Sequence, residues 1–89
     1  MNTSVTVNQP IDITALGFTR AKGPRLSSWP RRMVWQDQEY SFVELSMQYL
    51  VQKGQELIRL FDVSDGQTVF RLRQNPGGQW TLISTKAAV

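Results

Sequence analysis

A short segment near the N-terminus combines positive charge with aromatic residues. Half of the ten Lys and Arg residues lie there, and no Asp or Glu occurs between Asp12 and Asp37. Cationic side chains neutralise phosphates and aromatic rings stack on bases, so this combination is typical of sites for single-stranded nucleic acid. The alternative is that the net charge of +3 only keeps the domain soluble while the tryptophans pack in the core. The candidate nucleic-acid site comprises Arg20, Lys22, Arg25, Trp29, Arg31 and Arg32.

A second group of cationic residues follows predicted strands in the C-terminal half. Arg59, Arg71 and Arg73 are expected to align across neighbouring strands beside Phe61. Three arginines around an aromatic ring form a surface that a phosphate or a carboxylate-rich partner can bind. Such a face is also consistent with ordinary solvated side chains whose stems cover apolar surface. We refer to these four residues as the secondary basic face.

The aromatic residues offer a different class of function. Trp29 lies in Ser28-Trp29-Pro30, which either docks across the sheet with the ring buried or presents the ring to a partner. An exposed tryptophan is a frequent hot spot of protein interfaces. A protein-interaction or self-assembly domain that uses Trp29, Phe61 or an unpaired sheet edge is therefore the alternative to nucleic-acid binding.

The inventory of reactive side chains argues against catalysis. The chain contains neither cysteine nor histidine, which excludes disulfides, thiolate nucleophiles, cysteine-based metal sites and the commonest general base near neutral pH. The carboxylates of Glu39 and Glu44 are expected to face opposite sides, and Asn75-Pro76-Gly77-Gly78 lacks the residues that complete a phosphate-binding loop. We expect no enzyme activity, no metal and no cofactor.

Length and composition predict one folded domain. The 89 residues suffice for a single core, and 40% hydrophobic with 19% charged residues lies within the globular range. The apolar runs are far shorter than the roughly 20 residues of a membrane-spanning helix. Residues 1–15 show no secretory signal pattern, so a cytoplasmic location is expected.

Residues 1–28 differ from the rest of the chain because no pattern is sustained in them. Aliphatic residues between Val5 and Ile13 fit the two-residue period of a strand that Pro10 interrupts, so one short edge strand can dock there. Gly, Pro and Ser predict extended loop from Leu16 to Pro30. The chain is therefore divided into an N-terminal arm, partly disordered or docked as an edge strand (1–28), a β-meander domain (29–85) and a frayed tail (86–89).

A first hairpin is predicted from the aromatic residues that follow the arm. A two-residue loop at Asp37-Gln38 places Met33, Trp35, Tyr40 and Phe42 on one face. Cross-strand aromatic pairs contribute about 0.2–1 kcal/mol each, so this arrangement is favoured.

A second hairpin is predicted to turn at residues 63–67. A three-residue loop with a bulge at Gly66 sorts its side chains better than a two-residue Asp65-Gly66 loop, which mixes arginines with leucines. The bulged loop places Ile58, Leu60, Phe70 and Leu72 on one face, and Arg59, Phe61, Val69 and Arg71 on the other.

The remaining segments complete an antiparallel meander. Pro76-Gly77 suits the centre of a type II turn, after which Trp80 and Leu82 share a face with Phe70 and Leu72. Residues 45–55 fit either a strand or a short helix ending near Gly54, and the alternation favours a strand. The predicted fold is mainly β: a small antiparallel meander of about five strands, a curled sheet or partly open barrel, with an irregular N-terminal arm.

The stretch from Trp29 to Ser84 resembles a family of small uncharacterised bacterial domains that are encoded near or fused to error-prone DNA polymerases in actinobacteria. The shared pattern is a Pro followed by an aromatic strand, two further strands around a Gly turn, and a final strand with Trp. In this chain these segments are Pro30–Trp35, Tyr40–Val43, Leu60–Val63, Val69–Leu72 and Gly78–Leu82. The resemblance implies a DNA-associated accessory role and supplies no catalytic residues.

Overall fold

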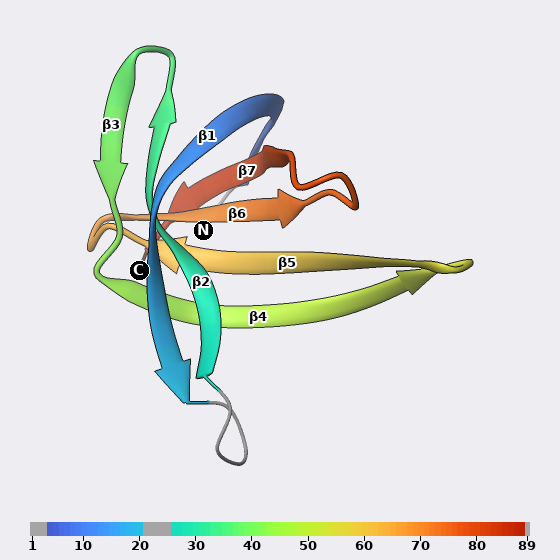
Figure 1. Cartoon of the computed structure of the whole chain (residues 1–89). Helices are drawn as coiled ribbons and strands as arrows, with labels where there is room; N and C mark the ends of the chain where they lie inside the picture. The colour runs from blue at the N-terminus through green and yellow to red at the C-terminus, as the bar shows by residue number, and fades with distance from the viewer. Residues whose placement is uncertain (1–3, 21–25, 89) are drawn as a thin grey trace.

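The computed structural model describes residues 4–20 and 26–88, which form seven antiparallel strands. The strands follow the order β3-β2-β1-β7-β6-β5-β4 within one sheet (Figure 1). No helix occurs in the described residues, and hence none that could cross a membrane. The strands are β1 (Val5–Arg20), β2 (Leu26–Trp35), β3 (Gln38–Ser41), β4 (Glu44–Lys53), β5 (Glu56–Ser64), β6 (Thr68–Gln74) and β7 (Trp80–Ala87).

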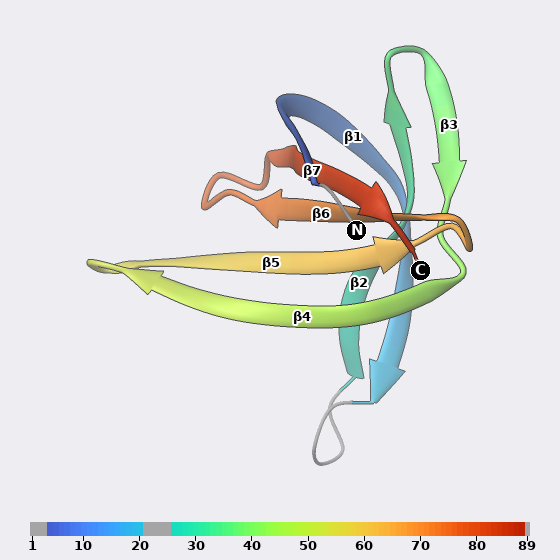
Figure 2. The same ribbon diagram turned by 180° about the vertical axis from the view of Figure 1, so that it is seen from behind.

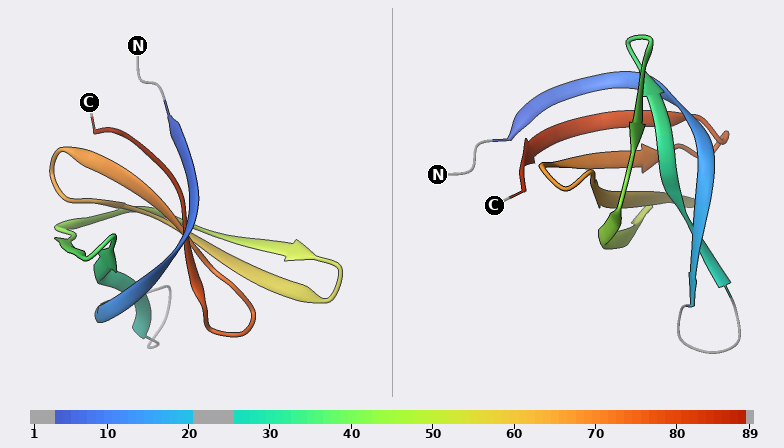
Figure 3. Two further views of the ribbon diagram at one scale, coloured as in Figure 1. Left: turned by 90° about the horizontal axis from the view of Figure 1, so that it is seen from above. Right: turned by 90° about the vertical axis from the view of Figure 1, so that its left-hand side faces the viewer.

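The sheet is strongly coiled and stays open. The ribbon of β1, β2 and β3 stands across the direction of β4 to β7, as the front and rear views show (Figures 1 and 2). Seen from above, the strands fan out around a common crossing point (Figure 3). The predicted antiparallel meander is confirmed as a curled sheet, with seven strands rather than about five.

The predicted N-terminal arm is wrong for the described part, because β1 lies in the middle of the sheet. Its first half, Val5 to Ile11, pairs with β7, whereas Asp12 to Arg20 pairs with β2. Each half is paired with a neighbouring strand on one side only. Pro10 therefore stands in a position like that of an edge strand, where proline is tolerated. Asn8 has a φ of 52° at a bulge in this ladder. These irregularities hid the strand from pattern-based prediction.

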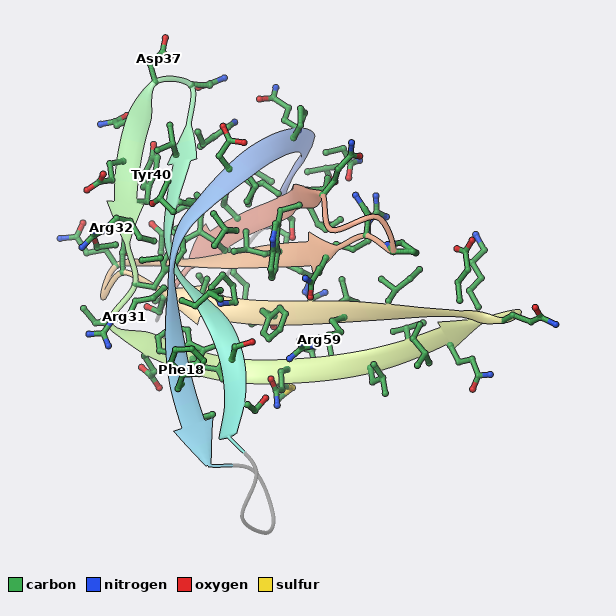
Figure 4. All side chains as sticks on the ribbon, viewed as in Figure 1. Phe18, Arg31, Arg32, Asp37, Tyr40 and Arg59 are labelled. Atoms are coloured by element: carbon green, nitrogen blue, oxygen red, sulfur yellow. The ribbon has the colours of Figure 1, made fainter. Side chains whose placement is uncertain are left out.

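The first predicted hairpin is confirmed, but its turn lies one residue earlier. Trp35 pairs with Gln38, so the loop is Gln36-Asp37, and both residues have positive φ (53° and 61°) as a type I′ turn requires. Asp37 stands at the tip of this hairpin (Figure 4). The register differs from the predicted one by two residues. Because this number is even, each side chain stays on its predicted face of the sheet. The four aromatic and apolar side chains of this hairpin therefore still lie against one core, as predicted.

The predicted register of the second hairpin is wrong by three residues, because a three-residue loop within residues 63–67 pairs Val63 with Gln67. Val63 pairs with Phe70 and Phe61 with Leu72, so Phe61, rather than Ile58 or Leu60, faces the core. The loop closes tightly because the Asp65 carboxylate accepts hydrogen bonds from the amides of Gln67 (2.9 Å) and Thr68 (2.8 Å). No extra residue is inserted, and a shift by an odd number of residues moves every side chain of a strand to the opposite face.

The last two strands agree with the sequence more closely. Phe70, Leu72 and Leu82 are buried, and Trp80 packs against them as predicted. Gly77 does not adopt a positive φ, and the left-handed residue is Gly78 at 87°. The loop is thus a type I turn followed by a bulge rather than a type II turn. β7 continues to Ala87, past the expected start of fraying, and the Ala88 amide donates to the Gln67 carbonyl at 2.9 Å.

The favoured strand at residues 45–55 is confirmed as β4, which turns at Gly54 with a φ of 64°. Between β3 and β4 the chain crosses from one half of the molecule to the other. There the Phe42 amide donates to the Arg31 carbonyl and the Val43 amide to the Ser64 carbonyl, both at 2.8 Å. The core collects the inward side chains of both halves: Ile11, Trp29, Met33, Phe42, Phe61, Val63, Phe70, Leu72 and Leu82.

Candidate binding surfaces

The structure separates the residues of the candidate nucleic-acid site. Lys22 and Arg25 lie outside the described residues, and for Arg20 only the backbone, at the end of β1, is described. Arg31 and Arg32 are exposed on β2. The Arg31 guanidinium lies 5.9 Å from the centre of the Trp29 ring, and Arg32 is 3.6 Å from the Glu39 carboxylate.

Trp29 is a buried anchor rather than a stacking platform. Only 8% of its surface is exposed, and its ring lies directly over Gly17 of β1. A Cβ atom at residue 17 would stand 2.7 Å from the ring, so that the ring or the backbone would have to move. The pairing of Gly17 with Trp29 therefore fixes β1 against β2, and the ring is not available to a nucleic-acid base.

Sequence reasoning missed an exposed aromatic residue next to this segment. Phe18 is 64% exposed on β1, next to the buried Gly17, and Figure 4 labels it beside this strand. Strand alternation could have identified it, because the residue after one that faces the core must face outward. Predicting a loop from Leu16 to Pro30 removed that signal.

The secondary basic face does not form as one surface. Phe61 is fully buried, and Arg59 lies on its side of the sheet with the guanidinium 4.9 Å from the ring centre. Arg71 and Arg73 lie on the opposite side, because Arg71 pairs with Asp62 and Arg73 with Leu60. The error in the predicted register, which is an odd number of residues, explains this separation.

Arg71 belongs to a closed polar cluster on β4, β5 and β6. Its guanidinium donates to both carboxylate oxygens of Asp62, at 2.9 and 3.0 Å, and the Tyr49 hydroxyl donates to the same carboxylate at 2.8 Å. Burial by itself raises the pKa of Asp62, but the hydrogen bonds from Arg71 and Tyr49 and the positive charge of Arg71 outweigh it and lower the pKa. The hydrogen bond to Asp62 raises the pKa of Tyr49. The polar groups of these three side chains are hydrogen-bonded to one another, and the cluster therefore stabilises the sheet.

β4 presents an unusual edge. It is a ten-residue outer strand whose charges stand only at its ends, Glu44 and Lys53. Met47, Leu50 and Val51 between them are exposed. Natural proteins usually protect such edges with charges, proline or short strands. An uncharged, apolar edge of this length favours pairing with another strand.

No three Asp or Glu residues cluster at a spacing suited to a metal ion within the described ranges. Comparisons with known proteins gave no match to a family model, a curated protein or a solved structure. The function is therefore argued from the geometry of the surfaces alone.

Proposed function

We propose that this chain is a non-catalytic, cytoplasmic binding module that pairs through the edge of β4 with a second copy of itself. The observation that carries the proposal is the uncharged, exposed edge of β4, from Leu45 to Gln52. Strand addition to a free sheet edge is a common mode of protein recognition, in which main-chain hydrogen bonds supply affinity. Two-fold symmetric dimers are the commonest homo-oligomers, and they need a self-complementary surface.

An antiparallel two-fold pair centred on Tyr49 makes β4 self-complementary. A two-fold axis perpendicular to the sheet keeps each face on its own side, so residues of equal parity stand opposite each other. In this register Met47 lies opposite Val51 of the second copy, and both side chains are exposed in the monomer, at 53% and 41%. Pairing thus buries apolar surface that otherwise contacts water.

The charges at the two ends of β4 support the same register. β4 has a bulge between Leu45 and Met47, where an extra residue shifts its ladder. If the extra residue of the bulge also shifts the pairing at the outer edge by one residue, Glu44 lies opposite Lys53 of the second copy. The two-fold axis then repeats this contact at the other end of the pair. Opposite charges across antiparallel strands contribute about 0.2–1 kcal/mol per pair. Other registers lose one or both contacts.

A charge-swap series tests the register. Analytical ultracentrifugation of the wild-type chain is expected to show a dimer. Met47→Lys places an ammonium group opposite Val51 of the second copy and should weaken dimerisation at least tenfold. Adding Val51→Glu to Met47→Lys lets the introduced charges face each other at both ends of the symmetric pair, and should restore the dimer.

Leu57→Lys serves as the control, because Leu57 is 55% exposed but lies on β5, away from the edge. It should leave the dimer unchanged. A wild-type chain that stays monomeric at about 0.5 mM, or a double variant that dimerises no better than Met47→Lys alone, would contradict the proposal.

A second candidate function is the binding of single-stranded nucleic acid, favoured by the exposure of Arg31, Arg32 and Phe18. These residues offer two cationic groups for phosphate contacts and a ring for base stacking, although Arg32 also lies 3.6 Å from the Glu39 carboxylate. Phe18 takes the stacking role that was predicted for Trp29. The resemblance to DNA-associated bacterial domains is compatible with this candidate.

Fluorescence anisotropy with a labelled oligothymidylate at several salt concentrations tests it. Replacing Arg31 and Arg32 together with glutamine should weaken binding and reduce the slope of log K against log salt by about 1.4, since each phosphate contact on a single strand contributes about 0.7. The matched control replaces Arg73 and Lys86, which lie on β6 and β7, with glutamine. Equal losses in the two double variants, or no binding at low salt, would count against a specific site.

A further inference from the structure

The concave side of the coiled sheet contains a cleft where its two halves face each other. The cleft has a volume of about 200 Å³. Trp29 and Trp80 line it together with Ile13, and Ser28 and Gln74 contribute polar groups. Arg59 forms part of its wall and also borders a neighbouring hollow of about 250 Å³ beside Leu50. Aromatic walls and one cationic group thus converge at a single place.

Arg59 is held in position without a counter-charge. Its side chain extends from β5 to β2, where the terminal nitrogen Nη2 donates to the Ser28 carbonyl at 3.1 Å (Figure 4). The ring of Phe61, 4.9 Å from the guanidinium carbon, packs against its face. No carboxylate lies within ion-pair distance of Arg59 in the described residues. Arg32 and Arg71 differ in this respect, since each lies within ion-pair distance of a carboxylate, that of Glu39 and of Asp62 respectively.

A partly buried guanidinium with unused N–H donors favours an anion, because charge-assisted hydrogen bonds strengthen in surroundings of lower dielectric. The indole of Trp80 beside it favours a flat apolar group. The guanidinium is already oriented by Phe61 and Ser28, so little conformational entropy is lost when it binds a ligand.

We propose that the cleft around Arg59 is a binding site for a small anion that carries an aromatic ring, with the anionic group on Arg59 and the ring against Trp80. The cleft is smaller than the roughly 300–1,000 Å³ of pockets for drug-sized ligands, which limits the occupant to about one ring with a short anionic substituent. A carboxylate and a phosphate share the required chemistry.

Titration of the wild-type chain with four probes tests the site, with tryptophan fluorescence and the indole N–H signals of the NMR spectrum as readouts. Benzoate and phenyl phosphate carry ring and charge, benzamide carries only the ring, and acetate carries only the charge. At least one of the first two should bind saturably in the millimolar range or better, and at least tenfold more tightly than benzamide and acetate. The stronger of the two shows whether the natural anion is a carboxylate or a phosphate.

Arg59→Met retains an apolar side chain of similar length and should weaken that binding at least tenfold. Arg73→Met is the matched control, because Arg73 lies on the opposite face of the sheet from Arg59. The wild-type comparison among probes decides the question even if Arg59→Met does not fold. Absence of saturable binding at 10 mM benzoate and phenyl phosphate, benzamide binding as tightly as both, or unchanged binding by folded Arg59→Met would overturn the proposal.

Discussion

At the scale of single residues, the contact between Gly17 and Trp29 shows how one missing side chain organises a strand pair. The indole fills the space that a Cβ atom at residue 17 would occupy, with three ring atoms at 2.7 to 3.0 Å from that position. Gly17 thus allows a bulky ring to be buried where two strands cross the coiled sheet. The same packing removes Trp29 from the surface and leaves Phe18 exposed.

Gly17→Ala should lower the free energy of unfolding by about 1–3 kcal/mol, because the added methyl group displaces a closely packed ring. Urea unfolding measures the loss, and a red shift of tryptophan emission would report that Trp29 has moved toward water. Gly77→Ala is the control, since no atom lies within 4 Å of a Cβ there and its φ is not positive. Equal stability of the Gly17→Ala and wild-type chains would contradict the packing described.

Asp62 gives stability a specific dependence on pH. Because its pKa is lowered in the folded chain, its contribution is present above the unfolded value of about 3.9 and is lost as the pH falls through the folded value. Asp62→Asn should therefore cost about 1–3 kcal/mol at pH 7. The difference from wild type should shrink below about pH 4, as urea unfolding at pH 7 and pH 3 can measure.

Asp12→Asn provides the comparison for this prediction, because Asp12 is exposed. It should change the free energy of unfolding by no more than about 0.5 kcal/mol at either pH. A stability difference for Asp62→Asn that is the same at pH 3 and pH 7 would show that the carboxylate charge is not what stabilises the cluster.

At the scale of elements, the turns decide the registers. The β2–β3 turn carries strain, because Gln36 adopts a left-handed conformation that glycine and asparagine tolerate better. Replacing Gln36-Asp37 with Asn-Gly should raise the free energy of unfolding by about 0.5–1.5 kcal/mol, since that pair is preferred in type I′ turns. Thermal unfolding would show an increase of several degrees in Tm.

The reverse change at the β4–β5 turn, which lies far from the β2–β3 turn, checks the explanation (Figure 1). Gly54 has a φ of 64° with nothing within 4 Å of a Cβ, so Gly54→Ala should be destabilising through backbone strain alone. A lower Tm for the Asn-Gly variant, or no effect of Gly54→Ala, would mean that φ is not the deciding factor in these loops.

The sequence allowed the strand content to be predicted where polarity alternates, as in β2, β3, β6 and β7. It failed in two places for physical reasons. The β5–β6 register depends on hydrogen bonds that the Asp65 carboxylate accepts from amides of the loop, which polarity does not reveal. β1 changes partners in its middle. Pro10 and Gly17 therefore do not end the strand, although each residue type usually argues against a regular strand.

The site predictions inherited these two errors. The observed register of β5 and β6 places Arg59 on the opposite face from Arg71 and Arg73. Predicting a loop from Leu16 to Pro30 left the accessibility of Trp29 undetermined. The exposure of Arg31 and Arg32 needed no register, because charged side chains remain near water wherever the strand lies. Charge was thus easier to locate than the face of an aromatic ring.

At the scale of the whole molecule, two structural features join the halves of the sheet. β1 pairs with β2 along one half and with β7 along the other. The chain between β3 and β4 forms hydrogen bonds to both β2 and β5. Phe42 sits at this crossing, fully buried, and its ring lies 5.3 Å from that of Phe70 in the other half. The halves therefore share one core and should unfold together.

Phe42→Ala should lower the free energy of unfolding by about 3–5 kcal/mol, because it leaves a cavity where both halves meet. Unfolding followed by far-UV circular dichroism and by tryptophan fluorescence should give coincident curves for wild type and variant, as expected for one cooperative unit. Val43→Ala, at a neighbouring residue that is 69% exposed, should change stability by less than about 0.5 kcal/mol. If Phe42→Ala separated the two curves, the β1–β2–β3 ribbon would be able to unfold on its own. We do not expect that outcome, because β1 also pairs with β7. Unfolding of the ribbon would therefore break the β1–β7 ladder as well.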